Sequence, residues 1–263
     1  MQRFPHQTLV PTLILLCAIA LGWGAIARAA DSPQESPDEG ESIDSRITGF
    51  RHNRTVYISS PRGFRRNIDN WDQEAEAIRR RILVATGLHP IPEKTPLNVR
   101  RYPVVEKDDY TIEAVAFESV PGFYVTGNLY MPRGKHGPFP AMLCPHGHWG
   151  EGRLADVENG SVPGRCINFA RQGYVVFAPS MIGYNDSTQL EHHFDHPLWG
   201  QSLMGMQTWN NIRAIDFLLT LDAVDPERIG CTGASGGGTQ TFILAAIDDR
   251  VKVAVPVCMV SAH

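Results

Sequence analysis

Four short apolar runs with little polar alternation limit the folds open to this chain, and they lie at residues 140–144, 174–179, 228–233 and 251–257. Such runs are typical of strands buried on both faces of a parallel sheet. Segments with helical spacing of apolar residues separate them, at residues 163–172, 206–221 and 237–247. Strands that alternate with helices predict an α/β domain with right-handed crossovers.

An antiparallel hairpin is expected ahead of these runs. Residues 110–119 and 123–132 alternate apolar and polar side chains, and the turn Val120-Pro121-Gly122 separates them. Residues 110–263 are therefore predicted to form an α/β domain. Its sheet would be doubly wound and mostly parallel, with an antiparallel hairpin on its N-terminal side.

The region before the hairpin has a different composition. Residues 30–48 are rich in serine, proline and acidic residues, so they predict a disordered linker. A helix is expected from Asn70, with Gln73 as the capping-box partner and Gly87 just past its end. We assign residues 49–109 to an N-terminal helical extension.

Residues 1–29 have the pattern of a secretory signal peptide. Arg3 precedes an apolar run from Leu13 to Ile26, and Ala27-Arg28-Ala29 suits cleavage before Ala30. The alternative is a membrane anchor, but the run is shorter than the ~20 residues that a spanning helix needs. We expect a secreted or periplasmic protein with no stable membrane anchor after cleavage.

Charge and cysteine content exclude some partners. The formal net charge is −4, and loss of Arg3 and Arg28 with the signal peptide would leave 22 Lys and Arg against 28 Asp and Glu, or −6. Nucleic acid is therefore not an expected partner. Most of the remaining cysteines lie in strand-like runs, which favours free buried thiols, although a disulfide stays possible in an oxidising compartment. No cofactor motif is present.

The stretch Gly233-Ala234-Ser235-Gly236-Gly237 joins the run 228–233 to the helix expected from residue 237. This is G-x-S-x-G in the strand-to-helix setting that marks a nucleophile elbow. Gly233 and Gly237 would be structural, because side chains would collide where strand and helix nearly touch. Ser235 is the candidate nucleophile. A phosphate-binding turn is the alternative, but neither GK[ST] nor G-x-G-x-x-G is present.

A second glycine-containing loop, Pro145 to Gly150, follows the run 140–144. In a hydrolase with a nucleophile elbow, this loop supplies one oxyanion N–H and the residue after the serine supplies the other. We therefore expect the backbone N–H groups of His148 and Gly236 to stabilise the oxyanion.

Several further residues are candidates for the site. Trp149, Tyr184 and Trp199 are expected to bind substrate, because aromatic rings can stack on a sugar. Trp209 fits a helical core position better. A zinc site remains an alternative, with ligands from His146, His148 and the segment His192 to His196, but no standard metal spacing supports it. Asp186 is a weak candidate for a triad acid, because its strand precedes the elbow.

The motifs "VDPERIGCTGASGGGTQTF" and "PHGHWG" resemble those of α/β-hydrolases of the dienelactone hydrolase and acetyl xylan esterase group. The likeness runs from about Tyr110 to the chain end. It implies a serine esterase acting on a small-molecule or carbohydrate ester, without a metal or cofactor. The chain differs from acetyl xylan esterases in two places. Gly236 replaces a glutamine of the elbow, and "SMIGYNDS" replaces an Arg-Gly-Gln turn.

The resemblance also implies a triad in the order serine, acid, histidine. The acids between Ser235 and His263 are Asp248 and Asp249, which we expect at the opposite edge of the sheet. We therefore expect the triad acid and histidine beyond residue 263. The printed chain would then be a C-terminally truncated and nearly inactive part of the fold, with the apolar strand 251–257 at its edge. A prolyl oligopeptidase-type peptidase and a non-catalytic binding module are the alternative functions.

Overall fold

The computed structural model describes residues 55–58, 64–67, 70–158, 160–192 and 202–258. The chain divides into two compact units, Met1–Asp69 and Asn70–His263. Within the first unit, β1 (Thr55–Ile58) and β2 (Phe64–Asn67) pair antiparallel. The sequence analysis did not predict this small hairpin. The second unit contains the predicted α/β domain.

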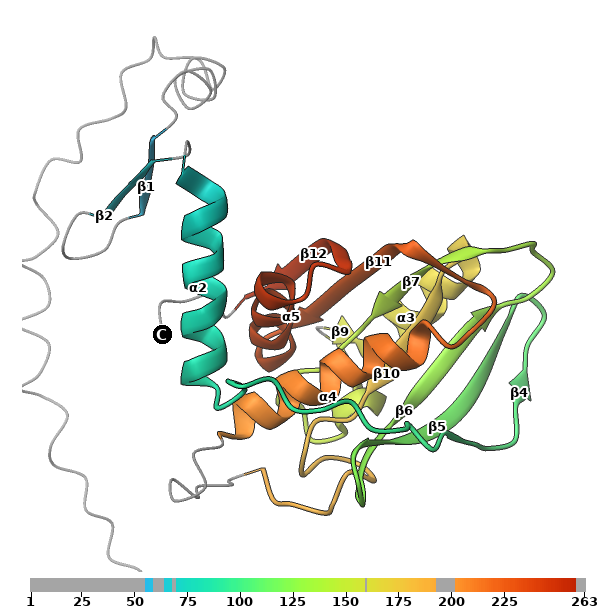
Figure 1. The fold of residues 1–263 in the computed structure, drawn as a ribbon. Coiled ribbons are helices and arrows are strands. Elements are labelled where there is room, and N and C mark those ends of the chain that lie inside the picture. Colours follow the sequence, from blue (N-terminus) through green and yellow to red (C-terminus); the bar gives the residue numbers. More distant parts are fainter. Residues whose placement is uncertain (1–54, 59–63, 68–69, 159, 193–201, 259–263) are drawn as a thin grey trace, which may run out of the picture. The chain divides into compact units, whose positions relative to one another are not determined.

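An eight-stranded mixed sheet forms the centre of this unit (Figure 1), with the order β12-β11-β7-β10-β6-β5-β3 and β4 paired to β5. The parallel strands are β7 (Phe139–Leu143), β10 (Val175–Pro179), β11 (Val224–Ala234) and β12 (Val251–Val257). All four predicted apolar runs are therefore confirmed as neighbouring strands. β12 lies at the edge of the sheet, as predicted, but it is largely exposed and not buried on both faces. Two short strands, β8 (Asp156–Val157) and β9 (Gly160–Ser161), form a separate ladder.

The predicted hairpin is also confirmed, as β5 (Tyr110–Val120) and β6 (Phe123–Pro132). It joins the parallel strands where β6 runs antiparallel to β10. The short strands β3 (Arg100–Arg101) and β4 (Val105–Glu106) extend the sheet beyond β5.

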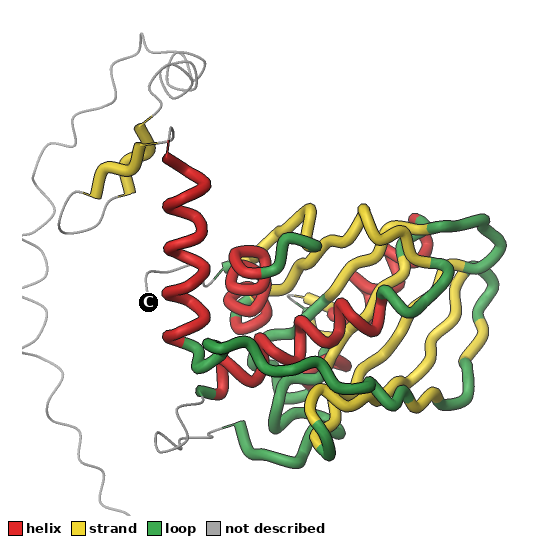
Figure 2. Tube along the Cα trace, viewed as in Figure 1, coloured by secondary structure: helices red, strands yellow, loops and turns green. Residues whose placement is uncertain are grey.

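Helices cover both faces of the sheet (Figure 2). On one face, α3 (Val162–Gln172) packs on residues such as Tyr130, Cys144 and Val176. On the other face, α4 (Leu203–Leu218) and α5 (Gly236–Ile247) bury Phe117, Leu143 and Phe177. A 3₁₀ turn, Gly152–Leu154, follows the loop after β7. The predicted doubly wound α/β fold is confirmed.

Helix α2 (Trp71–Ala85) matches the predicted span, but its expected N-terminal cap is wrong, since Asn70 makes no side-chain capping bond. Its C-terminal end is as predicted, because Gly87 has φ +75° and its N–H donates to the carbonyl of Val84 at 3.1 Å. Arg79 of α2 donates to the carbonyl of Ala246 on α5 at 3.3 Å.

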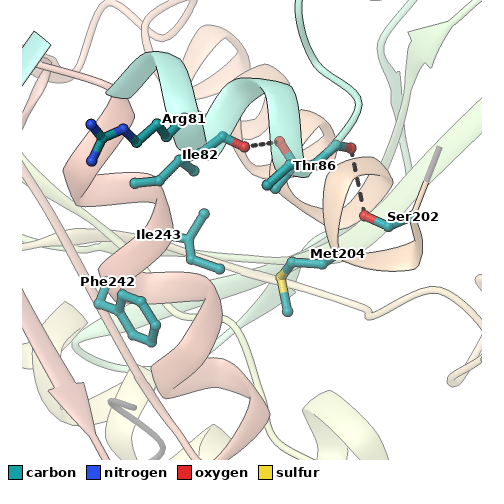
Figure 3. Close-up of a pocket in the computed structure, with 8 residues that line it drawn as sticks. Arg81, Ile82, Thr86, Ser202, Met204, Phe242 and Ile243 are labelled. Atoms are coloured by element: carbon teal, nitrogen blue, oxygen red, sulfur yellow. Dashed lines mark hydrogen bonds between the residues drawn. The ribbon is translucent and has the colours of Figure 1, made fainter. Parts of the chain in front are cut away.

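A pocket of about 480 Å³ lies where α2 meets the first turn of α4 and the middle of α5 (Figure 3). Ile82, Met204 and Ile243 give it an apolar lining. The Thr86 hydroxyl closes the end of α2 by donating to the carbonyl of Ile82 at 2.8 Å. The described lining includes none of the residues predicted for the site.

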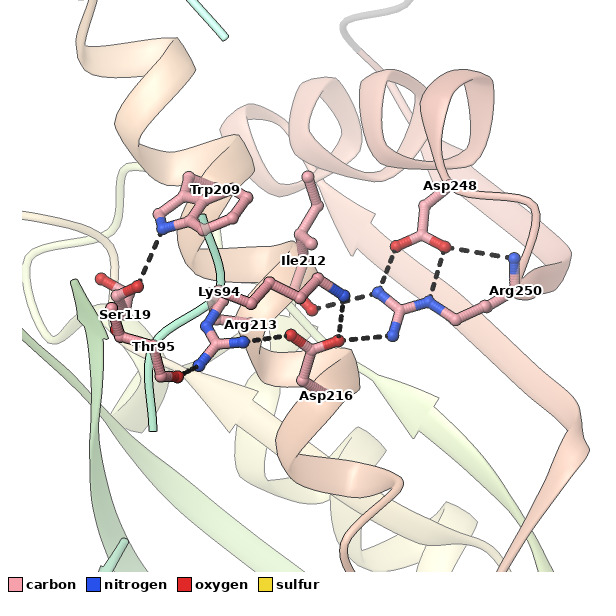
Figure 4. Close-up of polar contacts among 9 residues, drawn as sticks. All are labelled: Lys94, Thr95, Ser119, Trp209, Ile212, Arg213, Asp216, Asp248 and Arg250. Atoms are coloured by element: carbon pink, nitrogen blue, oxygen red, sulfur yellow. Dashed lines mark hydrogen bonds and ion pairs between the residues drawn. The ribbon is translucent and has the colours of Figure 1, made fainter. Parts of the chain in front are cut away.

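At the amino-terminal ends of the parallel strands, Asp216 accepts hydrogen bonds from three cationic side chains (Figure 4). They are Lys94 at 2.8 Å, Arg213 at 2.5 Å and Arg250 at 2.5 Å. Burial alone would raise the pKa of Asp216, but the hydrogen bonds from Lys94 and Arg250 outweigh it and lower that pKa below its usual value. Asp248 binds Arg250 at 2.6 Å, so it lies at this far edge, as predicted.

The aromatic and thiol side chains largely follow the sequence analysis. Trp209 is 4% exposed, and its indole N–H donates to the carbonyl of Ser119 at 2.9 Å, which confirms its core position. Cys144 and Cys231 are free and buried, as favoured for their strand-like runs, and Cys166 is also free and buried. The burial favoured for Cys258 is wrong: this thiol is free but exposed, since it follows the last residue of β12, whose valines 253 and 255 are also exposed.

Candidate active site

Ser235 occupies the turn between β11 and α5. Its backbone has φ +55° and ψ −122°, which a side-chain-bearing residue adopts only under strain. Two hydrogen bonds hold it there. Its N–H donates to the carbonyl of Val257 on β12 at 2.9 Å, and its carbonyl accepts from the N–H of Thr239 at 3.1 Å. The sharp bend places this serine at the carboxyl-terminal edge of the sheet, at the start of a helix.

The glycines around Ser235 lie in backbone-to-backbone contact with the loop after β7. A Cβ on Gly233 would lie 2.5 Å from the carbonyl oxygen of Pro145, and one on Gly237 would lie 2.4 Å from the same oxygen. Real Cβ atoms do not approach backbone oxygens so closely, so side chains at either position would push the elbow and the loop apart.

Gly147 makes the reciprocal contact from the loop. A Cβ there would lie 2.7 Å from the carbonyl oxygen of Ala234 and 3.0 Å from the Cβ of Ser235. The same Cβ would also lie 2.9 Å from Cζ3 of the Trp149 ring. Residues 145–149 therefore lie directly on the elbow, and this loop and the start of α5 border the space beside Ser235.

His148 and Gly236, the two predicted oxyanion donors, are neighbours. A Cβ on Gly236 would lie 2.6 Å from Cε1 and 2.9 Å from Nδ1 of the His148 ring. Gly236 begins α5, and amides in the first turn of a helix have no partner within the helix and point at incoming negative charge. The arrangement brings the His148 ring against Gly236, the residue that follows the candidate nucleophile.

A second imidazole binds His148. The Nε2 atoms of His148 and His192 are 3.0 Å apart, and Nδ1 of His192 is 2.8 Å from the carbonyl oxygen of Ile182. Because a carbonyl only accepts, Nδ1 of neutral His192 carries the proton and its Nε2 accepts from the Nε2–H of His148. Nδ1 of neutral His148 is then an acceptor. Burial and the neighbouring His192 lower the pKa of His148.

His146 belongs to the same loop after β7, and its side chain is fully buried. Its Nε2 accepts a hydrogen bond from the N–H of Met181 at 2.9 Å, and its Nδ1 donates to the carbonyl of Gly147 at 2.7 Å. Burial lowers the pKa of His146 to about 4, with smaller contributions from Arg153, His148 and His192. This imidazole is therefore neutral at pH 7, and it ties the loop after β7 to the loop after β10.

Arg153 holds the segment after β10 in place through Asp186. It is 6% exposed and binds both carboxylate oxygens of Asp186, at 2.6 and 3.0 Å. The carboxylate also accepts from the Thr126 hydroxyl at 2.6 Å. The pKa of Asp186 is lowered, because the hydrogen bonds from Arg153 and Thr126 outweigh the opposite effect of burial. Asp186 is thus bound to an arginine, which disfavours it further as a triad acid.

The predicted substrate-binding aromatic residues have different positions. The Tyr184 ring packs edge-on against the rings of His146 at 5.3 Å and His192 at 5.0 Å, so it is a half-buried part of the histidine cluster. Trp149 is half-buried over Gly147. Trp199 lies outside the described residues.

The alternative of a metal site finds no support in the part of the chain that the structure describes, where no three His, Cys, Asp or Glu side chains converge to hold an ion. His146 has both ring nitrogens engaged by backbone groups. His193, Asp195 and His196 lie outside the described residues.

Sequence reasoning missed two features of this site. The hydrogen bond between His148 and His192 joins residues 44 positions apart. The only sequence signal for it is that both residues lie in histidine-containing loops. Buried Arg153 gave no sequence signal, because a lone arginine after a loop is normally exposed.

A strained serine between a strand and a helix, at the carboxyl edge of a mixed α/β sheet with a glycine loop packed on it, defines an α/β-hydrolase. Within this superfamily, residues 97–260 match the acetyl xylan esterase (AXE1) family, and the chain belongs to that family. The predicted resemblance is thereby confirmed.

Individual relatives are more distant. YtaP of Bacillus subtilis, which carries the name of a hydrolase, is 28% identical over 190 residues, or 67% of this chain. The acetyl esterase Axe7A of Xylanibacter ruminicola is 26% identical over 183 residues, or 62% of this chain. Among solved structures, the methylesterase BT1017 superposes with a TM-score of 0.60 and 25% identity over 80% of this chain.

These relatives are longer than the chain described here. The aligned part spans 62% of YtaP, 39% of Axe7A and 44% of the methylesterase.

Proposed function

We propose that the protein is a secreted serine esterase that removes acyl groups from carbohydrate esters through an acyl-enzyme on Ser235. The observation that carries this proposal is the backbone of Ser235, held at φ +55° at the start of α5 with Gly147 packed on it. This is the geometry of a nucleophile that must stand clear of its own strand and helix. Membership of the acetyl xylan esterase family supports an ester as substrate.

The proposed reaction has two halves. The Ser235 hydroxyl attacks the ester carbonyl while a base takes its proton, and the N–H groups of Gly236 and His148 stabilise the negative oxygen of the tetrahedral intermediate. The intermediate collapses to the acyl-enzyme as the base returns the proton to the leaving alcohol. Water then repeats the sequence, and the acid leaves with Ser235 regenerated.

The base must have a free ring nitrogen. His146 does not meet this requirement, because both of its nitrogens are bound to backbone groups and its pKa is about 4. His146 instead holds the loop Pro145 to Gly150, here called the oxyanion loop, against the segment after β10. The order of the triad in this superfamily assigns the base and its carboxylate to later positions in the chain than Ser235.

The proposed substrate is an acetyl ester of a polysaccharide such as xylan. The family description and the acetyl esterase Axe7A support the acetyl group. Trp149 contacts Gly147 beside Ser235, and Tyr184 packs against His148. We propose that both rings contact the sugar and that Trp199 joins them.

Secretion follows from the proposed signal peptide, residues 1–29, which lie outside the described residues. Within the described part of the chain, no helix combines the length and apolarity required to cross a bilayer.

The test uses the full-length protein, a fluorophosphonate probe and p-nitrophenyl acetate. We expect covalent labelling at Ser235, located by peptide mass spectrometry, and a fall in kcat of about 10⁴-fold or more for Ser235→Ala. Thr111→Ala is the matched control, because it removes a half-buried hydroxyl from a different strand, β5, and it should keep full activity. Labelling at a different residue, or an active Ser235→Ala variant, would refute the proposal.

A further inference from the structure

A second pocket lies on the hairpin β5–β6, and its lining does not include Ser235. It is a groove of about 500 Å³ whose lining includes Ala114 and Ala116. These alanines lie on the face of β5 that is shared with α3, as the alternation along β5 requires. Ile112 on this face packs against the core beneath α3, whereas Ala114 is exposed. The groove therefore begins where the cover of α3 ends, and two methyl groups form its floor.

Strand register sets the walls of this groove. Ala116 pairs with Arg100 on β3 and with Thr126 on β6, so these three residues form one row across the sheet. In the next row, the N–H of Tyr102 donates to the carbonyl of Ala114 at 3.1 Å. Small residues in the central strand, with longer ones on both sides, leave an open channel between β3 and β6.

Two tyrosines give this channel its aromatic surface. Tyr102 is 50% exposed. Tyr124 lies beneath the guanidinium of Arg100, 5.0 Å from its ring centroid, and its hydroxyl accepts from Arg100 at 3.2 Å. The hydrogen bond from the Tyr124 hydroxyl to Glu118 raises the pKa of Tyr124. Tyr124 is thus held in place by charged neighbours, whereas Tyr102 is an exposed aromatic side chain with no equivalent cover.

The charges at the groove balance. Arg100 and Glu118 both lie at Tyr124, and Asp186 is paired with Arg153. The lining thus offers planar polar groups and aromatic rings without an excess of either sign. That combination suits a neutral sugar, whose C–H faces stack on rings and whose hydroxyls both donate and accept hydrogen bonds.

Residues 184–192 extend from the groove to His148, which lies beside Gly236. Asp186 and Gln189 line the groove, while Tyr184 and His192 of the same segment lie at His148. Gln189 is anchored on the hairpin, because its side chain accepts from the N–H of Tyr124 at 2.7 Å and donates to the carbonyl of Gly122 at 2.8 Å. A polysaccharide bound in the groove would pass over this loop to reach the nucleophile.

We propose that the groove floored by Ala114 and Ala116 binds the neutral sugar backbone of the polymer whose ester reaches Ser235. This inference rests on the proposed esterase function for its choice of sugar. The groove would hold unsubstituted sugar units. It would therefore contribute to the binding of polymeric substrates and not to the binding of small esters.

The test measures binding of unacetylated xylohexaose by calorimetry, with the full-length protein and two groove variants. Tyr102→Ala removes the exposed ring, and Ala114→Phe fills the floor from an exposed position without entering the core. We expect each variant to bind about tenfold more weakly. Val104→Ala, an exposed change just outside the groove, should bind as the wild type does.

Activity separates this proposal from the esterase proposal. The groove variants should raise KM about tenfold for acetylated xylo-oligosaccharide, with p-nitrophenyl acetate turnover within twofold of wild type. Xylohexaose binding lost in Tyr102→Ala, combined with turnover that does not depend on Ser235, would refute the esterase and keep the groove. Equal binding by all variants, no binding by the wild type, or binding of polygalacturonate alone would overturn the groove.

Discussion

The two ends of the parallel strands use ionisable groups in opposite ways. At the carboxyl-terminal end, His148 binds His192, and His146 and His192 bind backbone carbonyls, in hydrogen bonds that suit neutral imidazoles. At the amino-terminal end, Asp216 and Arg250 keep their charges through direct pairing. The first arrangement orients groups around Ser235, and the second fastens α4, β12 and the residue 94 loop together (Figure 4).

The difference follows from what each end must do. A neutral, buried imidazole is a rigid spacer that leaves no net charge to oppose an oxyanion forming nearby. A carboxylate paired with three cationic side chains joins the elements that carry them, but it has little free capacity to act on a substrate. In the described part of the chain, Asn98, Asn185, Ser235 and Cys258 are the residues other than glycine with positive φ, and Ser235 is the one in the turn between β11 and α5. The strained backbone of Ser235 and the charged network of Asp216 thus lie at opposite ends of the parallel strands.

The largest effect is expected from Asp216→Ala. Removal of this carboxylate, whose side chain is 13% exposed, leaves Lys94, Arg213 and Arg250 close together without their common partner. Loss of one partner of a buried ion network typically costs about 3–5 kcal/mol. Urea unfolding should show this loss, while exposed Asp222→Ala changes stability by less than about 0.5 kcal/mol. A loss below 1 kcal/mol for Asp216→Ala would show that the amino-terminal network does not stabilise the fold.

A smaller effect is expected from acid. The folded pKa of His146 is about 4 against 6.5 for the free side chain, so the unfolded state binds the extra proton between these values. Stability is therefore complete above pH 6.5 and falls by about 3 kcal/mol as the pH decreases to 4. Asp216, whose folded pKa is lowered below 3.8, contributes stability that is lost only below that range.

Unfolding by urea at each pH measures both windows. His146→Gln should flatten the curve between pH 6.5 and 4, whereas His89→Gln, a change at an exposed histidine, should leave the slope intact. A wild-type protein with constant stability over this window would contradict the neutral, buried state of His146, whatever the variant does.

The smallest effect is expected from Gly236→Ala. The new methyl would meet the end of the His148 ring, 2.6 Å from Cε1, and not backbone. The ring can turn away, which breaks its bond to His192 and disturbs the oxyanion loop. We expect kcat to fall about tenfold, or 1.4 kcal/mol, with little change in the urea midpoint. Gly150→Ala, which has open space around it, is the control, and equal activities would indicate that the His148 position is unimportant.

The sequence predicted the sheet well, because fully buried strands and an alternating hairpin leave strong patterns. It also predicted the elbow glycines, since the G-x-S-x-G spacing reflects a contact between neighbouring turns. The far-edge position of Asp248 followed from chain order alone. These predictions depend on residues that are close in sequence or repeat with a fixed period.

The parts that could not be predicted depend on long-range contacts. Helix α4 begins at Leu203 and not at Met206, because the Ser202 side chain caps it by accepting from the N–H of Gly205 at 2.9 Å. The partner of His148 lies 44 residues away, and the partner of Asp186 is an arginine that looked like a surface residue.

The contact of Gly147, Gly233 and Gly237 with opposing main-chain atoms also has a consequence for enzyme engineering. Laboratory evolution that randomises these positions should return glycine almost every time, so substrate range cannot be broadened there. Diversity is better directed to Met181–His192, a segment that contacts His148 through His192 and the hairpin through Gln189, without a backbone contact to the elbow glycines.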